Sequence, residues 1–465
     1  MIKTSKRDAF FYFPKLYLFD IVQLPPWKKR ICMLFLKSTM KLRLGANWDL
    51  SLLDSLKGTS VDTLFGKLPF DIVGGARPGF VLPQVKRNDV KRYIQACHEK
   101  GLEFSYLLNA PCLGNLQYSK KGYGQLIDLL EWIDQSNADS VIVGIPYLID
   151  LVRKRFPRLK VKVSTTARVN TVRKALQYEE MGVEEIIIDE HINREFKTLE
   201  AIRKAVRCNL ELIVNNICLW QCPYNYEHVN HDGHASRQGE EEDYCYLQYP
   251  GYLCLYRKLM EPVELLKSPW IRPEDTSHYE DIGYDHFKIT ERFKRTSLLL
   301  EHVKAYENRH YNGNLLDLFT LPRKGAFTPV HLEYFIKPEH VNIMKVSELG
   351  KVFDLEVREL IQIDNNKLSG FLEHFKAKDC NQTSCSDCLY CETVFEKVAI
   401  VNSQEVKKAA QRVKNFSEKL LSGEIFDIPH SHFIFRIPLI KLLLKKLLQW
   451  RLGKEQKDQE TQTCV

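Results

Sequence analysis

Residues 184–216 read EEIIIDEHINREFKTLEAIRKAVRCNLELIVNN, and this stretch decides the predicted fold. Two short β-rich runs, 184–189 and 210–216, stand on either side of a segment, 191–206, whose apolar residues recur at spacings of three and four. Such spacing is typical of an amphipathic helix. A strand, a helix and a second strand in this order predict parallel strands covered by helices.

The same alternation extends back to residue 42 and on to residue 290. The β-rich runs are LRLGA, VDTLF, FSYLLN, SVIVG, VKVST, EEIIID, LELIVNN and DHFKIT. Eight parallel strands close a barrel, so we expect an α/β fold of the (β/α)8 TIM-like type. An open doubly wound sheet is the alternative, but no Gly-x-Gly-x-x-Gly follows any of these runs, so its dinucleotide-binding form has no support.

The chain of 465 residues is long enough for one large domain with smaller parts attached. We expect an N-terminal extension over 1–40 and the barrel over 41–311, with a long cysteine-rich loop after the seventh strand. A smaller cysteine-rich extension is predicted over 312–400, followed by a basic helical tail over 401–465.

Composition favours a soluble cytoplasmic protein. Hydrophobic residues make up 44% of the chain, and the net charge of +8 permits an anionic partner such as RNA. The thirteen cysteines are odd in number and the N-terminus lacks the apolar run of a signal peptide, which favours a reducing compartment. No run is apolar enough to span a membrane. The amphipathic segment 433–454 could contact an anionic membrane surface, although docking on the protein is the favoured interpretation.

Polar residues follow nearly every predicted strand. In a barrel the active site lies at the carboxyl ends of the strands, whereas we expect Val, Ile and Leu inside them. The polar residues at these ends are Asn47, Arg77, Asn109, Ser164, Thr165, Thr166, Asp189, Glu190, Asn215 and Asn216. The change from apolar to polar residues predicts an active-site mouth.

Roles are assigned to some of these residues from their chemistry. Asp189 and Glu190 are expected to accept protons, with Asn109 in the same catalytic group. Arginine forks hold carboxylates or phosphates through paired hydrogen bonds. The residues expected to bind substrate are Asn47, Arg77, Arg272 and Arg292. For Arg272, a structural role as a helix cap or a partner of Glu274 is equally open.

A loop of about seventy residues separates the last two predicted strands, far longer than is usual, and long loops are commonly functional. Its cysteines, named here the loop cysteines, are Cys218, Cys222, Cys245 and Cys254. Thiolates select zinc or an iron–sulfur cluster, so the loop cysteines, with three histidines close by, predict a metal centre. The alternative is that they are small buried apolar residues, as we expect for Cys32, Cys97 and Cys208.

A second group of cysteines lies in the segment CNQTSCSDCLYC, 380–391. This C-terminal cysteine group consists of Cys380, Cys385, Cys388 and Cys391. Four thiolates within one short polar segment can hold one zinc ion or one iron–sulfur cluster. One of the four could instead complete the metal centre of the loop cysteines.

Four sequence elements together resemble a known family. These elements are GKLPFDIVGGARPGF (66–80), NNICLWQCP (215–223), IRPED (271–275) and FKITER (287–292). The sequence is similar over residues 41–300 to peptidase family U32, the collagenase-like peptidases. The resemblance implies a TIM-like barrel. It also implies a four-iron–four-sulfur cluster, for which Cys218, Cys222 and Cys254 match the family's ligands and Cys245 is the candidate fourth.

Iron–sulfur members of that family support oxygen-independent hydroxylation of RNA bases or of the ubiquinone ring. The resemblance therefore implies an RNA or small aromatic substrate, a carboxylate oxygen donor and a partner protein of the same family. A peptidase is the first alternative, although neither His-Glu-x-x-His nor Gly-x-Ser-x-Gly occurs. An RNA-binding module stabilised by zinc is the second. A radical S-adenosylmethionine enzyme is excluded because Asn225 occupies the place of the third cysteine of its motif.

Overall fold

The computed structural model describes residues 40–237, 245–292, 294–321, 337, 339–346, 352 and 355–428. The predicted N-terminal extension and the amphipathic segment near the C-terminus lie outside the described residues, apart from residue 40. The described residues from 41 onward belong to one compact unit. The predicted domain boundaries stay predictions.

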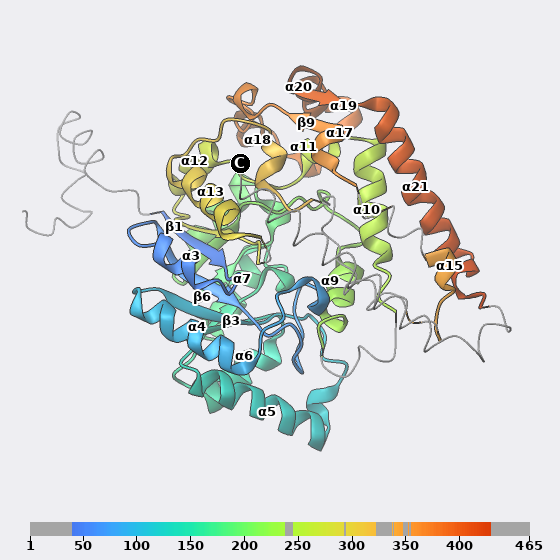
Figure 1. Ribbon diagram of the computed structural model, residues 1–465. Helices are drawn as coiled ribbons and strands as arrows, with labels where there is room; N and C mark the ends of the chain where they lie inside the picture. The colour runs from blue at the N-terminus through green and yellow to red at the C-terminus, as the bar shows by residue number, and fades with distance from the viewer. Residues whose placement is uncertain are drawn as a thin grey trace, which may run out of the picture. The chain divides into compact units, whose positions relative to one another are not determined.

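Eight parallel strands close into a barrel, as predicted (Figure 1). The strands are β1 (Lys41–Gly45), β2 (Val61–Gly66), β3 (Glu103–Leu108), β4 (Ser140–Val143), β5 (Lys160–Val163), β6 (Glu185–Ile187), β7 (Asn209–Ile213) and β8 (His286–Ile289). Each strand pairs with the next along the chain, and β1 closes the barrel on β8, where Leu44 is opposite Ile289.

Helices cover the barrel between the strands. They are α3 (Leu50–Ser55), α4 (Arg87–Glu99), α5 (Lys120–Gln135), α6 (Pro146–Arg155), α7 (Val172–Glu180), α8 (Phe196–Ala205) and, after β8, α13 (Thr296–Glu307). The predicted helix over 191–206 is confirmed only from Phe196. Its first residues belong instead to a 3-10 turn, η4 (Glu190–Ile192), because the Asp189 side chain caps that turn by accepting from the His191 amide.

The loop between β7 and β8 is helical. It contains α9 (Asn225–His234), α10 (Tyr249–Met260), α11 (Glu264–Lys267), the 3-10 turn η5 (Pro273–Asp275) and α12 (Thr276–Glu280). Beyond the barrel, β9 (Ile361–Ile363) and β10 (Ala399–Val401) pair antiparallel, and α18 (Glu373–Ala377), α20 (Tyr390–Val398) and α21 (Ser403–Leu421) follow the chain. The long helix α21 lies beside α10 (Figure 1).

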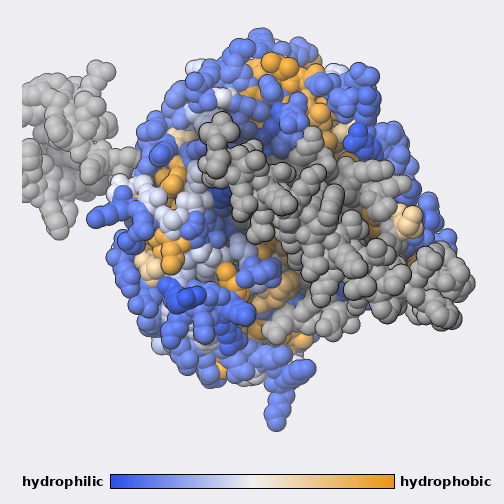
Figure 2. Space-filling model, in the orientation of Figure 1, coloured by the Kyte–Doolittle hydropathy of each residue, from blue (hydrophilic) through white to orange (hydrophobic). Residues whose placement is uncertain are grey.

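The face of the molecule in Figure 2 is mostly hydrophilic where it is described, with hydrophobic residues in separate patches. Of the helices in the described part of the chain, none combines the length and hydrophobicity that crossing a bilayer requires.

Charged side chains fill one layer of the barrel interior, so the expectation of apolar strand interiors is wrong here. This interior charge network consists of Arg43, Lys162, Glu185, Glu211, His286 and Lys288. Glu185 lies 3.2 Å from the Lys162 ammonium and 2.8 Å from His286 Nδ1, and Glu211 lies 3.0 Å from the Lys288 ammonium. Burial is tolerated because each charge faces an opposite one.

An apolar layer lies above the interior charge network. It consists of Phe65, Leu107, Ile142, Ile187 and Ile213. Ile187 and Ile213 come two residues after Glu185 and Glu211, and side chains two apart on a strand share a face. The apolar layer is therefore nearer the carboxyl ends and separates the charges from the mouth.

The interior charge network makes the stability of the protein depend on pH. Burial alone would raise the pKa of Glu185, but Lys162, His286 and Arg43 lower it well below its ordinary value. The carboxylate therefore stabilises the fold above about pH 4.3, its pKa in an unfolded chain. This contribution is lost as the pH falls through the lower pKa of the folded state.

We predict that Glu185→Gln lowers the free energy of unfolding by about 3–5 kcal/mol at pH 7, because it leaves buried cations without their counter-charge. Glu184 is exposed and is the matched control; Glu184→Gln should change stability by less than about 0.5 kcal/mol. Urea unfolding measures both, and the gap between Glu185→Gln and wild type should narrow in acid. Equal losses in the two variants would contradict the prediction.

Candidate functional site

Polar side chains join the loops at the mouth of the barrel. Asn109 follows β3, and its Oδ1 accepts from the Ala76 amide at 3.3 Å while its Nδ2 donates to Ser164 Oγ at 3.4 Å. These bonds connect the loops after β2, β3 and β5. Asn109 thus positions the mouth, and its catalytic role stays a prediction.

Asp189 lies buried at the end of β6. Arg168 Nε lies 2.9 Å from Asp189 Oδ2, and the His191 amide donates to Asp189 Oδ1 at 3.1 Å. Burial and the negative charge of Glu190 raise the pKa of Asp189, against the opposing effect of Arg168. A carboxyl group with a raised pKa is suited to proton transfer.

Glu190 is held by two neighbouring loops. It accepts from Asn216 Nδ2 at 2.8 Å and from the Thr165 hydroxyl. Its carboxylate is therefore fixed between the ends of β5 and β7, at the place where the sequence predicted an acid.

The first two loop cysteines lie directly beyond β7, and Cys218 and Cys222 share a hydrogen bond. This bond lowers the pKa of the Cys222 thiol to about 7, whereas it combines with burial to raise the pKa of Cys218. Asn225 Nδ2 donates to Cys218 Sγ at 3.7 Å.

His191 was not singled out from the sequence, although it directly follows the two predicted acids. Its Nδ1 accepts from the Gln221 amide at 2.9 Å, which leaves Nε2 as the free nitrogen. Burial favours the neutral imidazole, yet interactions with Cys218, Glu190 and Asp189 raise the pKa of His191. The two acids, the imidazole and the two thiols therefore influence one another's protonation.

The other two loop cysteines differ in their surroundings. Cys254 lies on α10, near enough to Cys222 for its charge to oppose ionisation there. Cys245 instead neighbours Lys337 and Glu339. The structure therefore gathers three of the four predicted ligands and gives Cys245 a separate environment.

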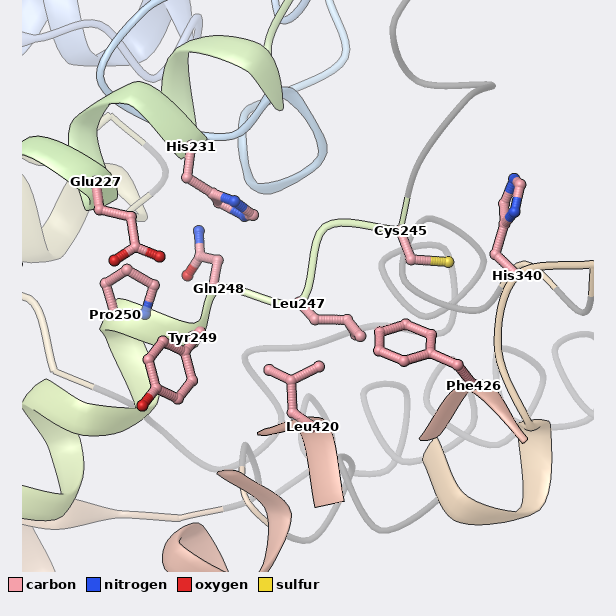
Figure 3. A pocket seen from close by; sticks show the side chains of 10 residues that line it. All are labelled: Glu227, His231, Cys245, Leu247, Gln248, Tyr249, Pro250, His340, Leu420 and Phe426. Carbon is pink, nitrogen blue, oxygen red and sulfur yellow. The ribbon is translucent and has the colours of Figure 1, made fainter. Parts of the chain in front are cut away.

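Cys245 lines a cavity of about 410 Å³ (Figure 3). Its walls come from α9, the start of α10 and the residues before it, His340, α21 and the segment beyond α21. The lining residues are Glu227, His231, Cys245, Leu247, Gln248, Tyr249, Pro250, His340, Leu420 and Phe426. The cavity is distinct from the polar mouth, because none of the predicted strand-end residues lines it.

Metal binding is supported at the loop cysteines by donor chemistry rather than by a closed set of ligands. Within the ranges that the structure describes, no group of three or more His, Cys, Asp or Glu side chains is arranged to hold a metal ion. Two thiols in contact and a third nearby are nevertheless the donors that iron–sulfur clusters and zinc prefer. The residues that could hold such a group are Cys218, Cys222 and Cys254.

Three cations, Lys67, Arg77 and Arg292, gather in the loops after β2 and β8. Lys67, directly after β2, is buried and pairs with Asp71 at 3.1 Å. Arg292 is also buried, and burial together with the nearby charge of Arg77 lowers the pKa of Arg292 to about 9. Arg292 Nη1 has no hydrogen-bond partner, and no carboxylate pairs with Arg292 among the described residues. The charge of Asp232 raises the pKa of Arg292 against these two effects, although the two side chains form no ion pair.

Glycine at the end of β1 permits this arrangement. A Cβ atom on Gly45 would lie 2.1 Å from the Glu291 carbonyl oxygen and 2.7 Å from Arg292 Cγ. A larger residue would therefore displace the chain that carries Arg292.

Two predicted substrate-binding residues are engaged in structural contacts. Arg272 forms a two-pronged ion pair with Asp275, with both N···O distances 2.8 Å, and its third nitrogen donates to the Asn365 carbonyl. Arg272 therefore has the structural role given above as the alternative to substrate binding. Its partner is Asp275 and not Glu274. Asn47 donates to Thr296 Oγ1 at 3.0 Å and so ties the loop after β1 to α13.

Asn215 is also structural. It donates to Glu291, and its Oδ1 accepts from the Thr290 amide at 2.9 Å. Lys67 and Asp71 were missed from the sequence; their spacing of four residues just after a strand was the available signal.

Comparisons with known proteins give matches to peptidases. The sequence model described as peptidase family U32 matches residues 81–312. A relative from Methanocaldococcus jannaschii, described as an uncharacterized protease, is 30% identical over 329 residues, which is 70% of this chain and 86% of the relative. The solved structure of the U32 peptidase Mk0906 is 23% identical, with a TM-score of 0.42, and covers 54% of this chain and 92% of its own.

We predict that Cys222, in reduced and metal-free protein, reacts with iodoacetamide with a midpoint near pH 7, because the Cys218 hydrogen bond stabilises its thiolate. In Cys218→Ala the midpoint should rise toward about 8.5, the ordinary value for cysteine. Mass spectrometry of the labelled peptides measures each site. Cys208, whose pKa burial raises to about 12, is the internal control and should stay unlabelled near pH 7. An unchanged midpoint in Cys218→Ala would exclude the hydrogen bond as the cause.

Proposed function

Because this chain belongs to peptidase family U32, we propose that it is an iron–sulfur enzyme supporting oxygen-independent hydroxylation of an RNA base or a quinone-like ring. The observation that supports this most directly is the contact between Cys218 and Cys222, with Cys254 nearby, beside the polar mouth of the barrel. Thiols gathered beside a polar barrel mouth are suited to cluster chemistry rather than to a purely structural role.

The side chains of the mouth have different roles in the proposed reaction. Arg292 and Arg77 bind an anionic group, either the carboxylate of an oxygen donor or a phosphate of RNA. Asp189, with its raised pKa, moves a proton, while Glu190 holds the loops on either side of it. When bound by the loop cysteines, a cluster supplies electron transfer to the substrate held there.

Metal analysis tests the proposal. Protein purified without oxygen should contain iron and acid-labile sulfide, and Cys218→Ser should lose about four iron atoms per chain, the content of one such cluster. Cys208→Ser is the matched control, because Cys208 is a half-buried thiol outside the mouth. Iron-free wild-type protein, or unchanged iron in Cys218→Ser, would refute the proposal.

The reaction is tested in cells. RNA nucleosides and quinones from cells lacking this chain should lack one species that carries an added oxygen atom, and the wild-type chain should restore it. Arg292→Met should fail to restore it while keeping its iron, because the variant removes the anion-binding group and leaves the cysteines in place.

A thiol-dependent peptidase is the second candidate. This candidate is favoured by the position of His191, which interacts with both Asp189 and Cys218 at the mouth, and by the protease description of the relative. A cysteine nucleophile needs an adjacent imidazole that is oriented by a third group. Cleavage of a gelatin substrate by iron-free protein, lost in His191→Ala and in Cys218→Ala, would favour this candidate over the first.

A further inference from the structure

The C-terminal cysteine group lies on three short turns of helix. Cys380 begins the 3-10 turn η8 (Cys380–Gln382), and Cys385 and Cys388 are the ends of α19 (Cys385–Cys388). Leu389, with a φ of 49°, reverses the chain between α19 and α20. Cys391 follows in the first turn of α20, so the four thiols are brought into one neighbourhood.

Contacts of neighbouring side chains connect the ends of this segment. His374 Nε2 lies 3.4 Å from Cys388 Sγ, and its ring stacks on Tyr390 with 3.8 Å between centroids. The group is polar and partly exposed, so burial of apolar surface does not explain it.

A buried arginine faces the same group. Arg194 follows η4, and its guanidinium lies over the rings of Trp270, Phe371 and Phe375 at 4.6, 5.2 and 4.8 Å. Two of its nitrogens donate to the Leu266 and Lys267 carbonyls of α11, whereas its Nε has no hydrogen-bond partner. In the described part of the chain no carboxylate forms an ion pair with Arg194. Phe371, one of these three rings, stacks on Tyr390, the residue before Cys391, with 5.7 Å between centroids.

A second cation lies close to the group. Lys267 pairs with Glu392, the residue after Cys391, at 2.7 Å and with Glu264 at 3.3 Å. The Lys267 charge is thus already neutralised, which leaves Arg194 as the buried cation without an ion-pair partner beside the cysteines.

We propose that the C-terminal cysteine group holds one metal centre through four thiolates, and that Arg194 balances its negative charge. A buried guanidinium needs a counter-charge, and neutral thiols do not provide one. Four thiolates around one zinc ion, or around an oxidised four-iron–four-sulfur cluster, leave a net charge of about −2.

Formation of the centre is balanced in protons and charge. Four thiols lose four protons to solvent as one Zn²⁺ binds, and no electron is transferred. The described residues hold no closed set of three such donors, so the sulfur atoms must converge when the metal binds. This centre is independent of the loop cysteines and of the proposed function.

The test is metal content per chain in full-length protein, measured for zinc and iron together with the visible spectrum. Cys385 is exposed, so Cys385→Ser should fold normally and lose one zinc or about four irons. Cys112→Ser, which alters another exposed cysteine, is the matched control and should keep all metal. Cys218→Ser should keep the C-terminal metal, so loss of the barrel centre is distinguishable from loss of this one.

Arg194→Met tests the charge argument. It keeps the stacking volume and removes the cation, and we expect affinity for added Zn²⁺ to fall about 10- to 100-fold, as for other residues behind a metal ligand. Arg194→Lys should recover part of the affinity. Metal content in Cys385→Ser equal to that of Cys112→Ser would overturn the proposed centre. Equal Zn²⁺ affinity in wild type and Arg194→Met would overturn the role of Arg194.

Discussion

The closed barrel imposes one constraint on the rest of this structure, because every charge inside it must be neutralised by another. Arg43 meets Glu185 at 3.4 Å and Glu211 at 3.6 Å, and these carboxylates in turn bind a lysine or histidine. With each of these cations next to a carboxylate, an apolar layer can lie directly above them. That layer separates the interior charge network from the mouth, so the polar groups of the mouth are free to act on a ligand.

Periodicity was enough to predict the barrel, because eight β-rich runs separated by helical segments leave few other folds. It did not predict the direction of Arg43 or Lys162. A charged residue within a strand is usually read as exposed, and only closure of the sheet turns these two inward. Cys245 shows the same limit. It lies nine residues before Cys254 in the sequence, but the helix α10 begins at Tyr249, between the two. The spacing therefore suggested that all four loop cysteines bind one metal, whereas Cys245 lies in a different environment from the other three.

The C-terminal part is attached to the barrel through buried arginines. Arg272 donates to the Asn365 carbonyl, and Arg358 donates to the Leu316 and Phe319 carbonyls at 3.1 and 2.7 Å. Arg358 thus satisfies two backbone oxygens and Arg272 one. Such contacts depend on distant parts of the chain, so a local sequence pattern around IRPED could not distinguish them from substrate binding.

Two buried arginines differ from the charges of the barrel interior, each of which pairs with an opposite charge. Arg292 at the mouth and Arg194 beside the C-terminal cysteine group are buried, and neither pairs with a carboxylate in the described residues. A lowered pKa of about 9 still leaves Arg292 charged at neutral pH. An unpaired buried charge costs several kcal/mol, which a chain that neutralises Arg43 so fully has the means to avoid. The charge of Asp232 acts on Arg292 and that of Asp275 on Arg194, but neither forms an ion pair with its arginine. In the two proposals above, the direct counter-charge is an anionic substrate at the mouth and a metal–thiolate centre at the C-terminal cysteine group.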